Sequence, residues 1–209
     1  MRSNRINIVY IDDINDEILS QYMNQEYCAT PFKRSADIQI EKNYSEIRFQ
    51  GVNGYEALFQ DVVVKSANVI LIDNHLFEEH TIGSGRFSGK QFKVILRKLL
   101  PYVEVIIVTQ DETLPGENVV HKFSIRQESS PSRYYWKHLA PCLDSAIKEV
   151  LYFEDLAEDL TQSQDVEKCL IDEVLNSLQG DNSYDALSKE DIDTLIRAFK
   201  EIQADYECK

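Results

Sequence analysis

The sequence predicts an α/β fold, with a doubly wound, five-stranded parallel sheet covered by helices on both faces. Two observations lead to this prediction. Short runs of β-branched and other apolar residues alternate along the chain with stretches of helical periodicity, as in successive strand–helix units. Several of the runs are apolar at nearly every position and stop at a polar residue, as strands buried on both faces do where they reach solvent.

The first two strand–helix units come before a long apolar run in the middle of the chain. We expect a strand at residues 6–11 and an amphipathic helix at residues 16–27. Residues 28–44 are polar and lack a clear period, so a loop is expected there. A strand at residues 46–52 and a helix at residues 55–64 form the second unit, with an Asn-Gly pair between them.

The later units begin with the most continuous apolar run, at residues 68–72. A polar connection at residues 78–88 leads into an amphipathic helix at residues 90–100, and Pro101 ends that helix because it cannot continue the hydrogen-bond ladder. The remaining expected elements are a strand at residues 103–108, a short strand at residues 118–121 and a helix at residues 134–153.

The end of the chain differs chemically from the rest. Residues 1–153 carry a net charge of −3, whereas residues 154–209 hold 16 acidic and 5 basic residues and carry −11. Apolar residues at helical spacing predict two further helices, at about residues 166–178 and 188–202. We therefore expect a folded domain over residues 1–153 and an acidic helical extension over residues 154–209, which either covers the domain or docks a protein partner.

The overall composition argues against several classes of protein. The 209-residue chain carries a net charge of −14, which disfavours direct binding to nucleic acid or to anionic membranes. No apolar run approaches the roughly 18 residues of a membrane span, and no signal-like segment precedes the first acidic pair. A soluble, cytoplasmic protein is expected, and its four scattered cysteines are expected to be reduced thiols.

Chemically useful side chains stand at the carboxyl ends of four expected strands. They are Asp12 and Asp13, Asp73, Thr109 and Lys122. Open parallel sheets build their ligand sites at this edge, so these side chains should converge. Three carboxylates in one place repel each other, and Mg²⁺ is the cation that carboxylates and water hold well. Asp73 could then attack a phosphoryl group, while Lys122 and Thr109 contact the phosphoryl oxygens.

The order of these motifs resembles the receiver domain of two-component response regulators, which has the flavodoxin-like fold. The matching segments are YIDD, NGYEAL, LIDNH, SGKQFKVILRKL, IVTQ and VHK, and together they span about residues 6–153. The resemblance implies a phosphoacceptor role for Asp73 and a sensor histidine kinase or another phosphodonor upstream. It also implies Mg²⁺ ligation by Asp12, Asp13, Asp73 and the backbone carbonyl of His75.

Several departures separate the chain from a typical receiver. Only 12 residues lie between Thr109 and Lys122, so the fourth helix should be reduced or absent. Gln110 occupies a position that is usually small, and Phe123 replaces the usual proline. Gln110 and the shortened region between Thr109 and Lys122 favour an alternative, a pseudo-receiver that works without phosphorylation as an adaptor or oligomerisation module.

The leading expectation is a signalling protein and not an enzyme. The phosphorylation state of Asp73 would alter the contacts that the C-terminal helices make with a downstream protein. A further alternative is a Mg²⁺-dependent phosphohydrolase, since an aspartyl-phosphate is also a hydrolytic intermediate. Homodimerisation stays open.

Overall fold

The structure is a computed structural model that describes residues 5–50, 56–76, 88–126 and 128–161, together with residues 172, 174–176 and 178. The helices expected at residues 166–178 and 188–202 lie outside the described residues, apart from those last five positions. No helix in the described ranges is long and apolar enough to cross a bilayer.

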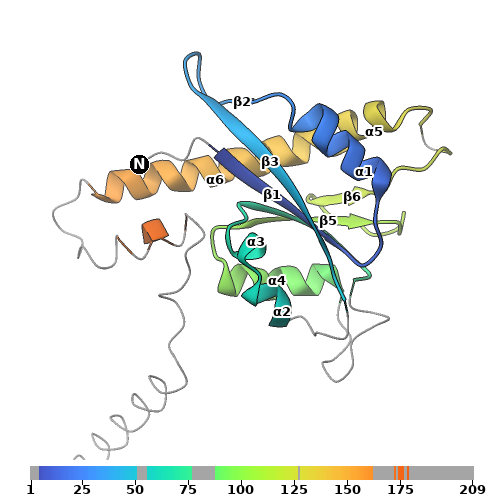
Figure 1. Cartoon of the computed structure of the whole chain (residues 1–209), viewed down its shortest axis with the longest axis horizontal. Helices are drawn as coiled ribbons and strands as arrows, with labels where there is room; N and C mark the ends of the chain where they lie inside the picture. The colour runs from blue at the N-terminus through green and yellow to red at the C-terminus, as the bar shows by residue number, and fades with distance from the viewer. Residues whose placement is uncertain are drawn as a thin grey trace, which may run out of the picture.

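Six strands form one sheet in the order β2-β3-β1-β4-β5-β6 (Figure 1). They are β1 Arg5–Asp12, β2 Phe32–Lys33, β3 Gln39–Arg48, β4 Val69–Asp73, β5 Glu104–Thr109 and β6 Val119–His121. All neighbouring strands are parallel except β2, which pairs antiparallel with β3. The five parallel strands have the 2-1-3-4-5 order of flavodoxin-like sheets. The predicted fold class is confirmed, with one additional antiparallel edge strand.

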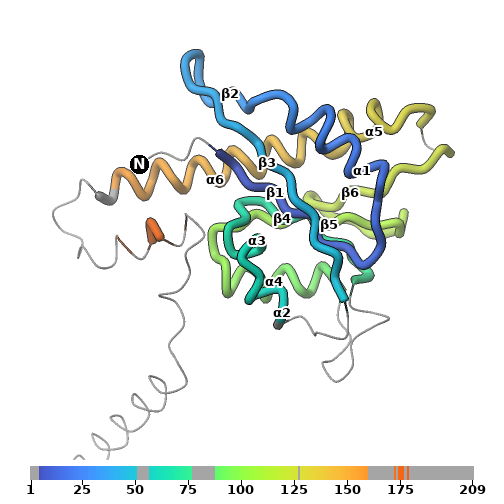
Figure 2. Tube along the Cα trace, in the orientation of Figure 1, coloured from blue at the N-terminus to red at the C-terminus, as the bar shows by residue number. Residues whose placement is uncertain are grey.

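Helices cover both faces of this sheet (Figures 1 and 2). They are α1 Glu17–Tyr22, the π-helical η1 Met23–Tyr27, α2 Glu56–Gln60, α3 Val62–Lys65, α4 Gly89–Leu99, α5 Pro131–His138 and α6 Ala140–Thr161. One buried cluster joins the sheet to α1, η1, α5 and α6, and a second joins it to α2, α3 and α4. The fold is therefore a three-layer sandwich with the sheet in the middle.

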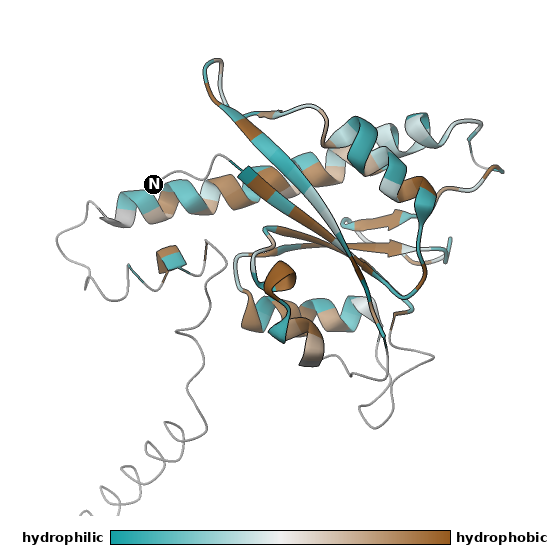
Figure 3. Cartoon of the chain, in the orientation of Figure 1, coloured by the Kyte–Doolittle hydropathy of each residue, from teal (hydrophilic) through white to brown (hydrophobic). Residues whose placement is uncertain are grey.

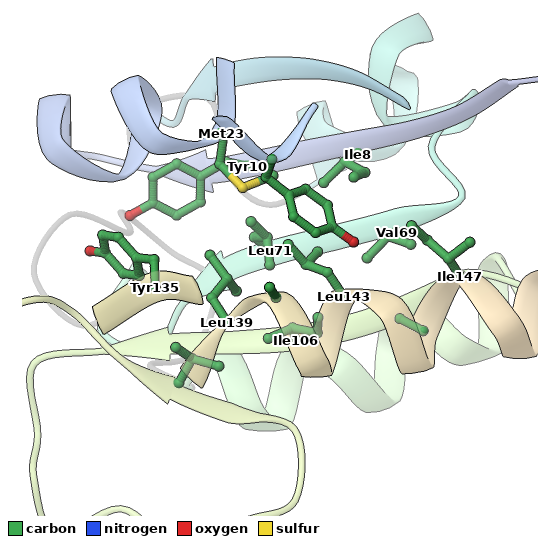
Figure 4. Packing of buried hydrophobic residues seen from close by; sticks show 14 of the residues in the cluster. Ile8, Tyr10, Met23, Val69, Leu71, Ile106, Tyr135, Leu139, Leu143 and Ile147 are labelled. Atoms are coloured by element: carbon green, nitrogen blue, oxygen red, sulfur yellow. The ribbon is translucent and has the colours of Figure 1, made fainter. Parts of the chain in front are cut away.

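Successive side chains of β1 point to opposite faces of the sheet, so this strand contributes to both buried clusters. Ile8 and Tyr10 belong to the cluster on the α6 face, whereas Val9 and Ile11 belong to the cluster on the α4 face. Figure 4 shows the first cluster, in which Leu143 of α6 packs among side chains from the strands. The period of two also places the side chains of residues 10 and 12 on the same face.

The expected loop at residues 28–44 is wrong, and so are the bounds of the second strand. This segment contains β2 and most of β3, and β3 pairs with β1 along eight positions from Arg5↔Glu41 to Asp12↔Arg48. The polar sequence hides the strand because few of its side chains are apolar, as the hydropathy colouring in Figure 3 shows. Its buried Lys42 extends over the Tyr27 ring, with Nζ 3.6 Å from the ring centroid, so a charged residue fits this inner face.

The region after β5 confirms the expected loss of a helix. Residues 110–118 form turns and irregular structure between β5 and β6. The single helix expected at residues 134–153 is two helices, α5 and α6, which meet at Leu139. The helix α6 runs on to Thr161 across the predicted domain boundary at residue 153, and the division into two domains stays a prediction.

Candidate functional site

Two buried carboxylates and one lysine meet at the carboxyl edge of the sheet. Asp12 ends β1 and is 4% exposed, and Asp73 ends the neighbouring β4 and is 5% exposed. Lys122 follows β6, and its Nζ lies 2.8 Å from Asp12 Oδ2 and 3.0 Å from Asp73 Oδ1. One ammonium group therefore bridges two strand tips that are far apart in sequence.

Asp12 has further hydrogen-bond donors beside Lys122. The hydroxyl of the buried Tyr10 donates to Asp12 Oδ2, and the backbone N–H of Ile14 donates to Oδ1 at 3.2 Å. Tyr10 comes from the strand itself, two positions earlier and on the same face. The Asp12 carboxylate is therefore fixed by three donors.

Asp73 is held by the turn that follows it. The backbone N–H of His75 donates to Asp73 Oδ2 at 2.7 Å, while the His75 side chain is exposed. The buried Asn74 donates its N–H to the Val108 carbonyl at 2.9 Å, and its own carbonyl accepts from Gly89 N–H at 2.8 Å. These bonds tie the Asp73 turn both to β5 and to the first residue of α4.

The beginning of α4 lies close against β4. Ser88 caps α4 by accepting from the Gln91 N–H, and the Gln91 side chain accepts from the Ser88 N–H, which completes a capping box. A Cβ atom on Gly89 would lie 2.4 Å from the Asp73 carbonyl oxygen. A residue with a side chain at position 89 would therefore push the helix away from the site.

Thr109 is fully buried at the tip of β5, next to β4. Its Oγ1 accepts from the Asp111 N–H at 3.0 Å, and its carbonyl accepts from the Lys122 N–H at 2.7 Å. The hydroxyl thus shapes the β5–β6 connection and still has its own hydrogen to donate. Gln110, the bulky neighbour, is exposed.

Two tyrosines of α5 hold the backbone on either side of Lys122. The Tyr134 hydroxyl donates to the His121 carbonyl at 3.1 Å, and the Phe123 N–H donates to the Tyr135 hydroxyl at 3.1 Å. The rings of Phe123 and Tyr134 also meet edge to face, 5.8 Å apart. The position of the lysine therefore depends on α5 as well as on β6.

The opposite charges of Lys122 and its carboxylate partners stabilise one another and shift their pKa values. Burial opposes ionisation of Lys122, but hydrogen bonds and attraction from Asp12 and Asp73 outweigh it and raise the lysine pKa above its ordinary value. Burial also opposes ionisation of Asp12, yet hydrogen bonds from Lys122 and Tyr10 hold its pKa below the usual range. Burial, followed by the charge of Asp12, raises the pKa of Tyr10, which stays a neutral donor.

Asp13 adds a third carboxyl group to those of Asp12 and Asp73. The three groups can be compared with what a Mg²⁺ ion requires. Burial is the main cause of a raised Asp13 pKa, followed by hydrogen bonding and repulsion from Asp12 and by repulsion from Asp73. Across the described ranges, no three His, Cys, Asp or Glu side chains group closely enough to hold a metal by themselves. Mg²⁺ usually keeps several waters and uses one or two carboxylates, so these residues would have to hold it as a hydrated ion.

Sequence reasoning found the charged and hydroxyl positions but missed residues that support them, among them Tyr10, Asn74, Gly89 and the α5 tyrosines. The structure brings Asp12, Asp73 and Lys122 into direct contact and places Thr109 at the neighbouring strand tip. The alternation of β1 could have indicated Tyr10, since it shares a face with the acidic residue two positions later. Asn74 and Gly89 gave no signal, because their role is to join a turn to a helix that is distant in sequence.

Comparison with known proteins adds little to this geometry. No protein-family model and no curated protein matches the chain. Among solved structures, the chain is similar to one described as the crystal structure of a two component transcriptional regulator AraC from Clostridium phytofermentans ISDg. The identity is 20% and the TM-score 0.40, over 72% of this chain and 98% of that one. A similarity this low has no weight for function, which has to be inferred from the site itself.

Proposed function

We propose that the protein is a response-regulator-like signalling protein in which Asp73 accepts a phosphoryl group. The observation that supports this most directly is the bridge from Lys122 Nζ to Asp12 and Asp73. A buried ammonium beside a strand-end carboxylate is the charge that a transferred phosphoryl group needs nearby. The role proposed for Asp73 is that of a phosphoacceptor, and the protein is proposed to be a switch and not an enzyme.

The chemistry needs one oxygen nucleophile and a source of positive charge. An Asp73 oxygen would attack the phosphorus of a phosphodonor such as a phosphorylated histidine kinase, forming an O–P bond. The bond from phosphorus to the donor breaks, and the leaving group keeps the electron pair. Lys122 would then exchange its Asp73 partner for a phosphoryl oxygen, and the Thr109 hydroxyl hydrogen could donate to another.

Mg²⁺ belongs to this proposal as the cofactor. When bound, it would offset the negative charge of the carboxylates and of the phosphoryl group. Asp13 and Asp73 are proposed as direct ligands, with the His75 carbonyl as a third. Asp12 would act mainly by holding Lys122, because its oxygens already accept from three donors.

A second candidate function is a pseudo-receiver that binds partners without phosphorylation. It is favoured by the ion pairs already present, since Lys122 alone neutralises much of the charge of Asp12 and Asp73. In this alternative the role of Lys122 is structural, because its ion pairs hold together the carboxyl ends of β1, β4 and β6. The output in either case would be contact with a downstream protein, through the C-terminal segment.

The two candidates differ in their response to a phosphoryl analogue. The full chain should be incubated with Mg²⁺ and either beryllofluoride or a small phosphodonor, followed by intact-mass analysis and thermal unfolding. The proposal predicts one stable modification and a higher melting temperature, both lost in Asp73→Asn. Asp61→Asn is a matched control, because that aspartate caps α3 and is not one of the proposed site residues.

Other outcomes of this experiment would indicate a different function. If the wild type and Asp73→Asn respond alike, the phosphoacceptor role is wrong and the adaptor remains. If phosphate is released catalytically from the donor without accumulation of modified protein, the chain is a Mg²⁺-dependent phosphohydrolase. Leaving out Mg²⁺ tests the cofactor separately, since the modification should then be slowed strongly.

A further inference from the structure

The helix α4 has a basic outer face with an apolar residue at its centre. Its 11 residues include four basic side chains and no acidic one, in a chain whose net charge is −14. Phe92 and Leu96 are fully buried. Val94 is two residue steps from each of them, so it lies on the opposite side of the helix, and it is 72% exposed. The exposed Lys90 and Lys98 stand about one turn before and one turn after Val94 on the same side.

The two lysines of this face are available for ion pairs with an acidic segment. Arg97, a third basic residue of α4, already pairs with Glu104 at 3.2 Å. Within the described ranges, no ion pair involves Lys90 or Lys98. The face therefore offers two positive charges, about 12 Å apart along the helix axis, with an exposed apolar group between them. It suits an occupant that is acidic and also carries apolar side chains.

The end of the same chain has this composition. Residues 181–193 hold five acidic residues and one basic residue. The helix expected at residues 188–202 supplies apolar side chains at helical spacing, among them Ile192, Leu195 and Ile196. Acidic and apolar residues therefore occur together in one stretch, as the face of α4 requires.

This acidic stretch is also within reach of α4. The ring of Phe153 in α6 meets the ring of Tyr102, three positions after the end of α4, with the centroids 5.5 Å apart. Thr161, the last residue of α6, is eight helical steps or about 12 Å beyond Phe153. The 19 residues between Thr161 and Asp181 would span about 25 Å even without fixed structure, twice the length needed to return to Phe153. Leu178 within this stretch is only 6% exposed, so other residues cover the chain at this point.

We propose that the acidic C-terminal segment of the chain, residues 181–202, docks on the outer face of α4 in the same molecule. Its carboxylates pair with Lys90 and Lys98, and its apolar side chains cover Val94. The same segment of a second copy has the same chemistry, but the covalent connection gives the chain's own segment an effective concentration of about 1 mM. The contact within one molecule is therefore favoured in dilute solution.

Docking on this face is connected with the candidate site through the start of α4. The Lys90 N–H donates to Asn74 Oδ1 at 3.3 Å, and the Gly89 N–H donates to the Asn74 carbonyl at 2.8 Å. Asn74 directly follows Asp73. A docked segment holds the first turn of α4 in place and thereby stabilises the turn that follows Asp73. Hydrogen exchange should therefore be slowed at Asn74 as well as in the segment.

Charge reversal in the full-length chain tests the proposal. In Lys90→Glu/Lys98→Glu, the amides of the segment and of Asn74 should exchange with deuterium about tenfold faster than in wild type, because repulsion replaces two ion pairs. Lys137→Glu/Lys148→Glu is the matched control, since it makes the same change of charge at exposed lysines of α5 and α6, which cover the other face of the sheet. Exchange should be unchanged in this control, and circular dichroism confirms the folded state of each variant.

Zero-length cross-linking of the wild type identifies the contact directly. A carbodiimide joins an amine only to a carboxylate in contact with it, so peptides that link Lys90 or Lys98 to the segment are expected in monomeric protein. Links confined to dimers, or protection of the segment that depends on protein concentration, would assign the face to a second copy and overturn the proposal. Equal exchange of the segment in wild type and in Lys90→Glu/Lys98→Glu would also overturn it. Unchanged exchange at Asn74 alone would overturn the connection with the site.

Discussion

Replacing Lys122 with methionine, which keeps most of the side-chain volume and removes the charge, should destabilise the fold strongly. The change leaves Asp12 and Asp73 facing each other, with 5% and 7% of their side chains exposed. Removing one partner of a buried ion pair costs about 3–5 kcal/mol, since the remaining charge is unpaired. Asp12 retains the Tyr10 and Ile14 donors, so we expect a loss of about 3 kcal/mol at neutral pH, near the lower limit.

The pH dependence of this loss follows from the shifted groups. Lys122 has a raised pKa, so its contribution is complete below the ordinary lysine value and is lost as pH rises through the raised one. Asp12 has a lowered pKa, so its contribution is present above the ordinary aspartate value and is lost as pH falls through the lowered one. The difference in unfolding free energy between wild type and Lys122→Met should therefore be constant near neutrality and shrink at both extremes.

Urea unfolding followed by circular dichroism measures this difference. Lys65→Met, on the exposed side of α3, is the control and should change stability by about 0.5 kcal/mol or less. Adding Asp73→Asn to Lys122→Met should recover part of the loss, because one of the unpaired charges is removed. A loss below about 1 kcal/mol, the level of a solvent-exposed ion pair, would refute the described bridge.

Three further predictions concern neighbouring positions. Gly89→Ala should cost about 1–3 kcal/mol in urea unfolding and reduce labelling of Asp73 by a phosphodonor, because its Cβ would collide with the Asp73 carbonyl; unchanged labelling and stability would contradict that contact. Tyr10→Phe should cost about 1–3 kcal/mol at neutral pH, and the difference from wild type should shrink at acid pH as Asp12 is protonated in both; a pH-independent cost would contradict a charge-assisted hydrogen bond. Leu143→Ala should cost about 2–5 kcal/mol at the buried centre of α6, and a smaller value in the same assay would argue against the packing in Figure 4.

The sequence was a good guide to the sheet centre and a poor one to its edge. The strands β1, β4 and β5 are buried on both faces over most of their length, so most of their residues are apolar and their ends are easily recognised. The strand β3 is polar because only one side of it is well covered, and short β2 lies beyond it. Local composition could not show that Lys42 would be buried over a tyrosine ring.

The site was predictable to the extent that it depends on strand ends. Asp12, Asp73 and Lys122 meet because parallel strands deliver their carboxyl ends to one edge. The supporting contacts of Gly89 and Tyr135 could not be predicted, since each depends on how closely a helix approaches a strand. Such approach distances follow from packing over the whole layer and not from nearby sequence.

The three-residue β6 has a dynamic consequence. It forms the outer edge of the sheet and pairs with β5 alone, so few backbone hydrogen bonds retain it besides those of the α5 tyrosines. Amide protons of Val119 and Val120 should therefore exchange with solvent deuterium sooner than those of central β4. Lys122 would then follow an edge strand that opens early, whereas Asp12 and Asp73 end central strands that open late.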